Sequence, residues 1–447
     1  MTLFKILPFG IKNSIFETTK HMHMKSFLLV LLIVISNTIT AQVVALSTNP
    51  TAAGFSTDKL KKLDASLADW AKKEWMNGGV ALIIRNDKIA YYKAVGFNNI
   101  ATKEVLQKDA IFRIASQTKA ITSVAIMQLY EDGKLLLDDA VSKYIPGFAR
   151  QQVLDKFNAT DTTYTTIKAK RDITIRDLLT HTSGLGYAQI GSKEANAIYA
   201  KNNITAGIGV TNDKLSDAMN RLGKLPLMHQ PGEKWTYGLN CDVLGYLVEI
   251  LSGMSLSDYF TEKIFKPLGM NDTYFNIPKA KAKRLVNLYT EDSLGNLKIV
   301  TTSNLLNGPT VANYPLVAHT YYSGGAGLSS TIYDYAIFLQ MLLHEGTYNG
   351  NTILSRNSVR MMTMNQIGDV PFGDNKFGLG FEIVTEKGSS KFPAQQGTYS
   401  WGGAFATSYW VDPKEKMVLL FYRQLQGGSH GDVVHKFRAL TYQAIKD

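Results

Sequence analysis

The sequence predicts an α+β fold in which an antiparallel β-sheet is flanked by helices and a second lobe is mostly helical. Strand-like runs occur near both ends of the chain, whereas its long middle is typical of helix and loop. No internal repeat and no low-complexity linker divides the sequence. A single domain whose sheet pairs the two ends of the chain, with a helical insertion packed beside it, accounts for this order.

The first strands follow a predicted amphipathic helix at 58–75. Two apolar runs, 80–85 and 89–95, are separated by Asn86 and Asp87, a pair that is typical of a turn between strands. We therefore expect a β-hairpin here.

Helices are predicted through the middle of the chain. The segment 116–131 has apolar residues at helical spacing and is followed by Gly133, which favours a helix end. Shorter helices are expected at 175–182 and 242–251. The helical lobe should span about 116–330.

Strands return near the C-terminus, at 381–385, 404–411 and 417–422, and a terminal helix follows at about 433–445. These strands are expected to join the hairpin in one sheet. The substrate cleft should then lie between the sheet and the helical lobe.

The N-terminal region has the pattern of an export signal. Lys25 precedes an apolar run at 27–35, and small or polar residues lead to Ala41. The run is much shorter than the roughly 20 residues that a membrane-spanning helix needs. We expect a cleaved signal and no stable membrane anchor after its removal.

Cleavage would leave a mature chain that begins at Gln42. Residues 1–41 are then an upstream extension and signal peptide, with Met22 and Met24 as alternative starts, and 42–447 form one catalytic domain. The mature protein is expected in the periplasm or the medium.

Composition limits the kind of partner. The formal net charge is +11, but the basic residues are spread along the chain apart from a short cluster at 279–284, which argues against nucleic-acid binding. The only cysteine is Cys241, so no intramolecular disulfide can form. A small-molecule substrate is the expected partner, and the oligomeric state is open.

A Ser-x-x-Lys pattern at the start of a helix suits nucleophilic catalysis. Serine needs a base to take its proton, and residues three apart share one helix face. Two matches occur: Ser116 with Lys119, and Ser56 with Lys59. Ser116 follows a buried-looking run and opens an apolar helix, whereas Ser56 is better explained as the N-cap of the first helix. Lys119 can serve as that base if desolvation or nearby positive charge keeps it neutral.

A competing G-x-S-x-G match surrounds Ser429, at 427–431. In hydrolases with this motif the acid and the histidine follow the serine, and only Asp432, His435 and Asp447 remain downstream. A glycine-rich loop is the better interpretation. The histidines show no metal-ligand spacing and no phosphate loop is present, so neither metal nor other cofactor is expected.

Five stretches of the chain resemble the serine β-lactamase-related superfamily, which includes class C β-lactamases, D-alanyl carboxypeptidases and family VIII carboxylesterases. The stretches are FRIASQTK at 112–119, LLTHTSGL at 178–185, PGEKWTY at 231–237, PLGM at 267–270 and SGGAGLSST at 323–331. The resemblance covers about Ser56 to Lys446. It implies the β-lactamase/transpeptidase-like α/β sandwich.

The resemblance implies that Tyr237 is the tyrosine of the family's Tyr-x-Asn element, which shares a proton with the lysine and passes it to the leaving group. This sequence departs from the pattern, because Gly238, Leu239 and Asn240 follow and the position two after the tyrosine is leucine. Asn240 is the candidate to replace the missing substrate-binding amide.

The family's Lys-Thr-Gly element resembles Trp401, Gly402 and Gly403 here, as in family VIII esterases. Small residues suit a strand that a substrate carbonyl must approach closely. By resemblance, the oxyanion hole consists of the backbone N–H groups of Ser116 and Ala404. The expected substrate contacts are Trp401, Gly402, Gly403 and Asn240.

The resulting hypothesis is an exported serine hydrolase that acts through a covalent acyl-enzyme, most readily on esters. A β-lactamase, a D-alanyl carboxypeptidase or a D-aminopeptidase is the alternative among enzymes. A penicillin-binding or cell-wall-sensing protein whose acyl-enzyme never turns over is the non-enzyme alternative.

Overall fold

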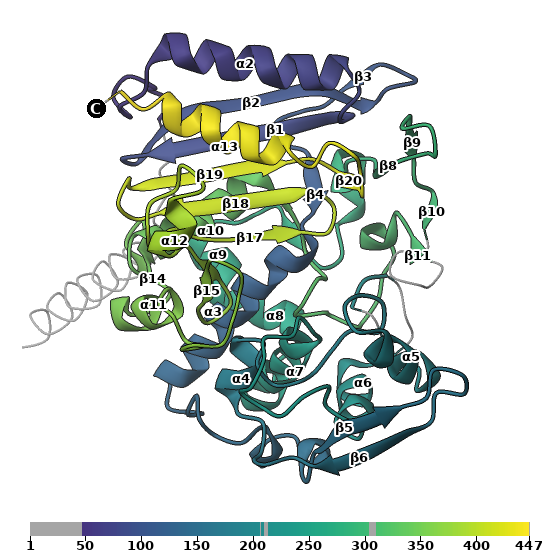
Figure 1. The fold of residues 1–447 in the computed structure, drawn as a ribbon. Coiled ribbons are helices and arrows are strands. Elements are labelled where there is room, and N and C mark those ends of the chain that lie inside the picture. The colour runs from purple at the N-terminus through teal and green to yellow at the C-terminus, as the bar shows by residue number, and fades with distance from the viewer. Residues whose placement is uncertain (1–46, 206, 210–212, 304–309, 447) are drawn as a thin grey trace, which may run out of the picture. The chain divides into compact units, whose positions relative to one another are not determined.

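The computed structural model describes residues 47–446 with the exception of 206, 210–212 and 304–309 (Figure 1). The expected signal peptide and cleavage point lie outside the described residues. Within the described part of the chain, no helix is both long enough and apolar enough to cross a bilayer.

The central sheet has eight strands, each antiparallel to its neighbours. In spatial order they are β15 (Lys376–Phe377), β16 (Glu382–Ile383), β17 (Tyr399–Gly403), β18 (Thr407–Asp412), β19 (Met417–Tyr422), β1 (Gly78–Arg85), β2 (Lys88–Asn99) and β3 (Glu104–Val105). Val80 in β1 lies opposite Tyr422 in β19, so the two ends of the chain meet in the middle of the sheet. The predicted hairpin and the pairing of the chain ends are confirmed.

Helices cover both faces of the sheet (Figure 1). The helices α2 (Thr57–Lys72) and α13 (Val433–Gln443) pack on one face, where Leu419 and Phe421 of β19 enter their apolar core. On the opposite face, α10 (Ile332–Leu343) packs against β1, β18 and β19. The predicted α+β class is confirmed.

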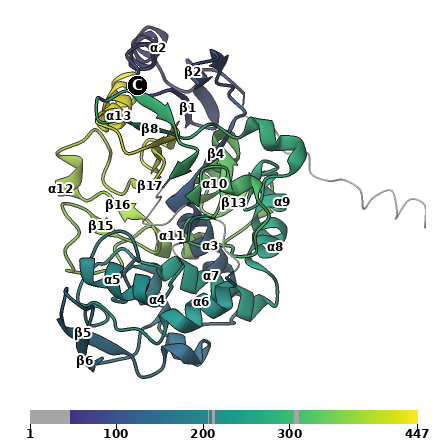
Figure 2. The ribbon, with the colours of Figure 1, turned by 90° about the vertical axis from the view of Figure 1, so that its right-hand side faces the viewer.

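The helical lobe lies between two short strands that pair with each other. These are β4 (Ile111–Arg113) and β12 (Ser329–Thr331), with β7 (Thr273–Tyr274) beside β12. The helices of the lobe are α3 (Thr118–Glu131), α4 (Ile175–Leu179), α5 (Lys193–Lys201), α6 (Leu215–Leu222), α7 (Asn240–Ser252), α8 (Leu256–Phe260) and α9 (Lys266–Leu268). Figures 1 and 2 place α3 between the sheet and the helices α4 to α6.

The smaller elements lie around this framework. They are the hairpin β5 (Gln152–Phe157) and β6 (Tyr164–Lys168), the strands β8 (Tyr289–Glu291), β9 (Leu297–Ile299), β10 (Thr302–Ser303), β11 (Thr310–Val311), β13 (Thr347–Tyr348), β14 (Asn351–Thr352) and β20 (Leu425–Gln426), and the helices α11 (Arg356–Met362) and α12 (Glu386–Ser389).

The strand β17 is the main element that the sequence pattern does not predict. Its residues include Gly402 and Gly403, which lower strand propensity, so the expected strand at 404–411 begins too early. The structure instead turns at 404–406 and resumes as β18. The strand that borders the pocket is therefore β17.

Candidate active site

Ser116 lies at a tight turn that leads from β4 into α3. The turn is the short 3₁₀ helix η1 (Ala115–Gln117), in which Ala115 has a left-handed backbone with φ of +43°. This conformation is unfavourable for a residue other than glycine and persists where its surroundings hold it. The Ile114 amide donates to the Leu328 carbonyl oxygen at 3.1 Å, which ties the turn to the chain leaving the lobe. Ser116 is thereby fixed at the start of α3.

The strand β17 packs directly against this turn. A Cβ atom at position 403 would collide with the Ile114 carbonyl oxygen and with Thr407 Oγ1, so glycine is required there. A Cβ atom at position 402 would meet only the Thr407 carbonyl oxygen, at 3.4 Å, and Gly402 lines the pocket. Gly403 therefore allows β17 to pack on the turn that carries Ser116, and Gly402 lies on the substrate side of the strand.

The Ser116 hydroxyl oxygen accepts hydrogen bonds from two side chains. Tyr237 Oη donates at 2.6 Å, and Lys119 Nζ donates at 3.2 Å. Lys119 lies one turn further along α3, and Tyr237 precedes α7. The structure thus brings together the three residues that the sequence analysis selects for catalysis.

Lys119 is buried, and each of its three N–H groups has an acceptor. In addition to Ser116 Oγ, it donates to Tyr187 Oη at 3.0 Å and to the Gly325 carbonyl oxygen at 2.7 Å. An ammonium group has three donors and no acceptor, so this set of partners is complete.

The charge of Lys119 differs from the sequence-based expectation. Burial disfavours the ammonium, but the oxygens of Tyr187 and Tyr237 outweigh that effect and raise the pKa of Lys119 above its ordinary value. A neutral lysine is expected from desolvation or nearby positive charge, and the tyrosine oxygens are not part of that expectation. With its pKa raised, Lys119 is an ammonium at neutral pH in the free protein.

Tyr187 is a member of this cluster that the sequence analysis does not identify. Its side chain is buried, its Oη accepts from Lys119, and it lines the same pocket as Ser116. Burial raises the pKa of Tyr187 well above its ordinary value, so the phenol stays protonated. It follows the 178–185 stretch closely, but the contact spans 68 residues and no local spacing reveals it.

Asn240 lies behind Tyr237 and does not line the pocket. Its side-chain nitrogen donates to His181 Nδ1 at 2.8 Å, and its side-chain oxygen accepts from Ser183 Oγ at 2.5 Å. The residue is fully buried at the start of α7, with its amide used by protein partners. The expectation that Asn240 contacts the substrate is therefore wrong.

Close packing explains why the residue after Tyr237, Gly238, is a glycine. A Cβ atom at Gly238 would collide with the Leu185 carbonyl oxygen, and Leu239 is buried in the core. The departure from the family's Tyr-x-Asn pattern thus comes with a close backbone contact between two parts of the lobe.

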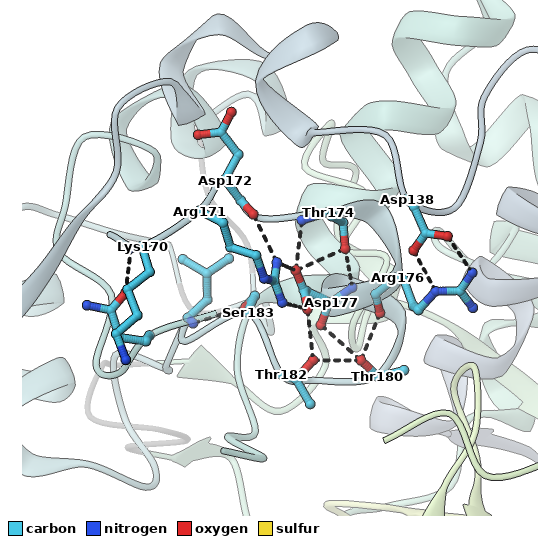
Figure 3. A network of polar contacts seen from close by, with 12 residues as sticks. Asp138, Lys170, Arg171, Asp172, Thr174, Arg176, Asp177, Thr180, Thr182 and Ser183 are labelled. Atoms are coloured by element: carbon cyan, nitrogen blue, oxygen red, sulfur yellow. Dashed lines mark hydrogen bonds and ion pairs between the residues drawn. The ribbon is translucent and has the colours of Figure 1, made fainter. Parts of the chain in front are cut away.

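A network of polar contacts ties the loop 180–183 to α4, where Thr182 Oγ1 donates to Asp177 Oδ1 at 3.2 Å (Figure 3). His181 of this loop packs on Tyr237. At the centre of the network, Asp177 accepts from the Thr174 amide at 2.9 Å and forms an ion pair with Arg171. The Thr174 hydroxyl in turn accepts from the Asp177 amide, completing a capping box on α4. The loop is fixed to the helix through this network.

A pocket of about 560 Å³ opens beside Ser116. Along one wall, β16 pairs with β17 only as far as Ser400, so the strand edge from Trp401 to Gly403 borders the opening. The Trp401 ring centroid lies 5.7 Å from that of Tyr237, and Ala404 lines the pocket with Ser116. Trp401 thus presents an apolar surface next to the nucleophile candidate.

The competing serines occupy other environments. Ser429 is exposed in a glycine-rich loop, where its amide donates to Glu291 Oε2 at 2.8 Å. Ser56 caps α2, accepting from the Lys59 amide at 3.4 Å, which confirms its predicted role. Neither serine lines the pocket that contains Ser116.

Comparison with known proteins agrees with this arrangement. The family model described as Beta-lactamase matches residues 60–443. The chain belongs to the Beta-lactamase family. A member of the family from Mycobacterium tuberculosis, Protein Rv1367c, is 32% identical over 373 residues, which cover 80% of this chain and 88% of that protein.

Two further relatives carry names that describe an activity. Esterase EstB of Burkholderia gladioli is 27% identical over 412 residues, covering 89% of this chain and 99% of the esterase. The structure of EstCE1, a hydrolase with promiscuous acyltransferase activity, has a TM-score of 0.73 and 25% identity, covering 86% of this chain and 99% of that one. The β-lactamase/transpeptidase-like fold is thereby shown.

Proposed function

We propose that this member of the Beta-lactamase family hydrolyses esters through a covalent acyl-enzyme on Ser116. The observation that carries the proposal is the pair of hydrogen bonds at Ser116 Oγ, from Tyr237 at 2.6 Å and from Lys119 at 3.2 Å. A serine held between two proton-handling groups at one end of a pocket is suited to nucleophilic attack.

In acylation, Ser116 Oγ forms a bond to the ester carbonyl carbon as its proton passes to Tyr237 Oη, in the form of the Tyr237–Lys119 pair that has lost one proton to solvent. The raised pKa of Lys119 keeps the remaining proton of the pair on Nζ, which leaves Tyr237 Oη to receive the serine proton. The pair then protonates the departing alkoxide as the bond between carbon and the alcohol oxygen breaks. Water repeats these steps on the acyl-enzyme, releases the acid and restores Ser116.

The negative charge that develops on the carbonyl oxygen needs donors. We assign these to the backbone N–H groups of Ser116 and Ala404, on two sides of the pocket entrance at the turn and at the end of β17. Preorganised donors of this kind typically contribute about 10²–10³-fold to kcat.

Trp401 supports an ester substrate over a β-lactam. A β-lactam has a carboxylate beside its scissile amide, and a cation there contributes about 1.5–3 kcal/mol through charge-assisted hydrogen bonds. Trp401 offers an apolar face and a single N–H donor instead. Arg423, a cation that could substitute from a neighbouring strand, is buried and does not line the pocket. The name of Esterase EstB agrees with an ester preference.

The deciding experiment compares kcat/KM for a short-chain p-nitrophenyl ester and a chromogenic cephalosporin on one preparation. We expect the ester to be preferred by about tenfold or more, because Trp401 stands where β-lactamases have a lysine and Arg438 lies nearer the opposite end of the pocket wall. A preference for the cephalosporin would identify a β-lactamase. A burst of one equivalent without turnover would identify a penicillin-binding protein.

We also propose that the protein is exported, on the evidence of Lys25, the apolar run 27–35 and Ala41. N-terminal sequencing of protein recovered from the periplasm or medium should give Gln42 as the first residue. Recovery of soluble cytoplasmic protein with an intact Met1 or Met24 terminus would contradict export.

A further inference from the structure

The end of the pocket remote from Ser116 holds a buried arginine without a polar partner. Arg438 of α13 is 7% exposed and lines the pocket, and it makes no hydrogen bond and no ion pair with any residue that the structure describes. Its guanidinium lies between two aromatic rings, 4.6 Å from the centroid of Phe392 and 5.4 Å from that of Trp410. Its Nε is buried without a hydrogen-bond partner among the described residues.

Two other buried arginines of the same protein show two different arrangements. Arg113 is 3% exposed, and it donates to the carbonyl oxygens of Ala312 at 2.8 Å and Val286 at 2.7 Å, and to Gln424 Oε1 at 3.1 Å. Arg423 is 5% exposed, and like Arg438 it has an Nε without a hydrogen-bond partner and lies over an aromatic ring, but it does not line the pocket. Desolvation of an unpaired charge is costly. Because Arg438 lines the pocket, a ligand bound there can supply the acceptor.

The sheet register shows how far apart the Arg438 end of the pocket and the turn that carries Ser116 lie along β17. Gly403 packs against the turn that carries Ser116, and three residues earlier on β17 Ser400 lies opposite Trp410, the ring that contacts Arg438. At the rise of an extended strand, three residues correspond to about 10 Å. The wall in between is largely apolar, with Ile208 and Val384 among its lining residues.

Two other titratable groups line this end of the pocket. Glu382 lies opposite Ser400 on the neighbouring strand, and its Oε1 accepts from Asn375 Nδ2 at 2.5 Å. His435, one turn before Arg438, stacks on Phe392 at 5.3 Å, and burial together with Arg438 lowers its pKa, so it is neutral at pH 7. The charge of Glu382 acts on Arg438 and favours the charged guanidinium, but the structure records no hydrogen bond or ion pair between these two side chains, and Glu382 already accepts from Asn375.

We propose that Arg438 binds a carboxylate at the far end of the substrate, so that the preferred esters carry an apolar chain between the scissile ester and a terminal anion. This rests on the proposed esterase function and specifies its substrate class. A guanidinium fork matches a carboxylate in shape and can donate two parallel hydrogen bonds. About 10 Å along β17 separates the two ends of this pocket wall, whereas the carboxylate of a β-lactam is next to the scissile bond.

The first test varies only the charge at the end of the acyl chain. Mono-p-nitrophenyl esters of adipic, suberic and sebacic acid are compared with their methyl-capped forms and with a chain of matched length that ends in trimethylammonium. We expect kcat/KM for the best carboxylate to exceed that of its methyl-capped form by about 10- to 100-fold. Equal rates, or a preference for the cation, would overturn the proposal, and the latter would point to Glu382.

Variants then assign the preference to one residue. Arg438→Met keeps an unbranched chain between the rings, and it should reduce the ratio of carboxylate to methyl-capped kcat/KM to near unity. Arg356→Met removes an exposed arginine on α11 and controls for net charge, so it should leave the ratio intact. Glu382→Gln should not lower the ratio. Circular dichroism checks folding, and Arg438→Lys, with an intermediate ratio expected, replaces a variant that fails to fold.

Binding without turnover separates this proposal from the proposed function. In Ser116→Ala protein, monomethyl suberate should bind about tenfold or more tightly than dimethyl suberate by calorimetry, and Arg438→Met in that background should remove the difference. Equal binding of the two probes would overturn the carboxylate site. Failure of every p-nitrophenyl ester to react, with this binding difference intact, would instead overturn the esterase function.

Discussion

At one end of the pocket, Ser116 and Lys119 have hydrogen-bond partners supplied by the protein itself; at the other, Arg438 has none among the described residues. Both ends are buried, and both are held by aromatic side chains. The protein alone therefore positions Ser116 and Lys119 for reaction, whereas Arg438 can take its hydrogen-bond acceptor from a ligand. The first end should respond to substitution through kcat, and the second through the choice of substrate.

The largest expected effect lies at the first end. Ser116→Ala removes the nucleophile, so we expect ester turnover to fall by about 10⁴-fold or more and labelling by a fluorophosphonate to be lost. The melting temperature should be nearly unchanged because no core cavity is created. Ser429→Ala is the matched control and should do little. Labelled peptide that maps to Ser429 would show that the wrong serine is assigned.

Tyr237→Phe comes next, since it keeps the ring and removes the oxygen that contacts Ser116. We expect kcat to fall by about 10²–10⁴-fold if that oxygen transfers protons, with a smaller change in KM. Lys119→Ala should be comparably severe. Steady-state kinetics with a p-nitrophenyl ester measures both variants. A Tyr237→Phe protein with wild-type kcat would assign the proton transfers to Lys119 and water.

Tyr187→Phe tests whether the partners of Lys119 matter as a complete set. Losing one acceptor of a buried ammonium should lower kcat by about tenfold or more, with little change in KM. Tyr199→Phe is the control, because Tyr199 is also buried but accepts from the Gly186 amide, at 3.2 Å, and not from Lys119. Equal effects of the two variants would mean that Tyr187 acts only through packing.

Asn240→Leu should have the smallest effect on activity. It tests whether Asn240 contributes to substrate binding at the Ser116 end of the pocket. We expect KM to change by no more than about twofold, while stability falls by about 1–3 kcal/mol because His181 Nδ1 and Ser183 Oγ lose their partner. Denaturant unfolding and ester kinetics measure the two quantities. A raised KM with unchanged stability would return Asn240 to the substrate contacts.

The sequence predicts the features that depend on local spacing. Ser116 and Lys119 are one helical turn apart, and strand periodicity predicts β1, β2 and β19. Tyr187 and Arg438 reach the pocket through contacts between distant parts of the chain, which no local pattern encodes. The charge of Lys119 depends on those same contacts, because burial alone would change its pKa in the opposite direction.

Asn240 shows where a prediction from motif position fails. Its place in the sequence, three residues after Tyr237, makes it a reasonable replacement for the family's amide. The start of α7 at that residue directs the side chain into the lobe, toward His181 and Ser183. A motif aligned by position does not fix the direction of a side chain when a glycine and a helix start intervene.

The strands at the centre of the sheet are synthesised at very different times. The ribosome makes β1 early, but Val80 finds its partner Tyr422 only when the chain is nearly finished. Domains generally fold as units, so this sheet cannot close during most of translation. If the protein is exported as proposed, this delay would keep the polypeptide extended enough to pass through a secretion channel before it folds.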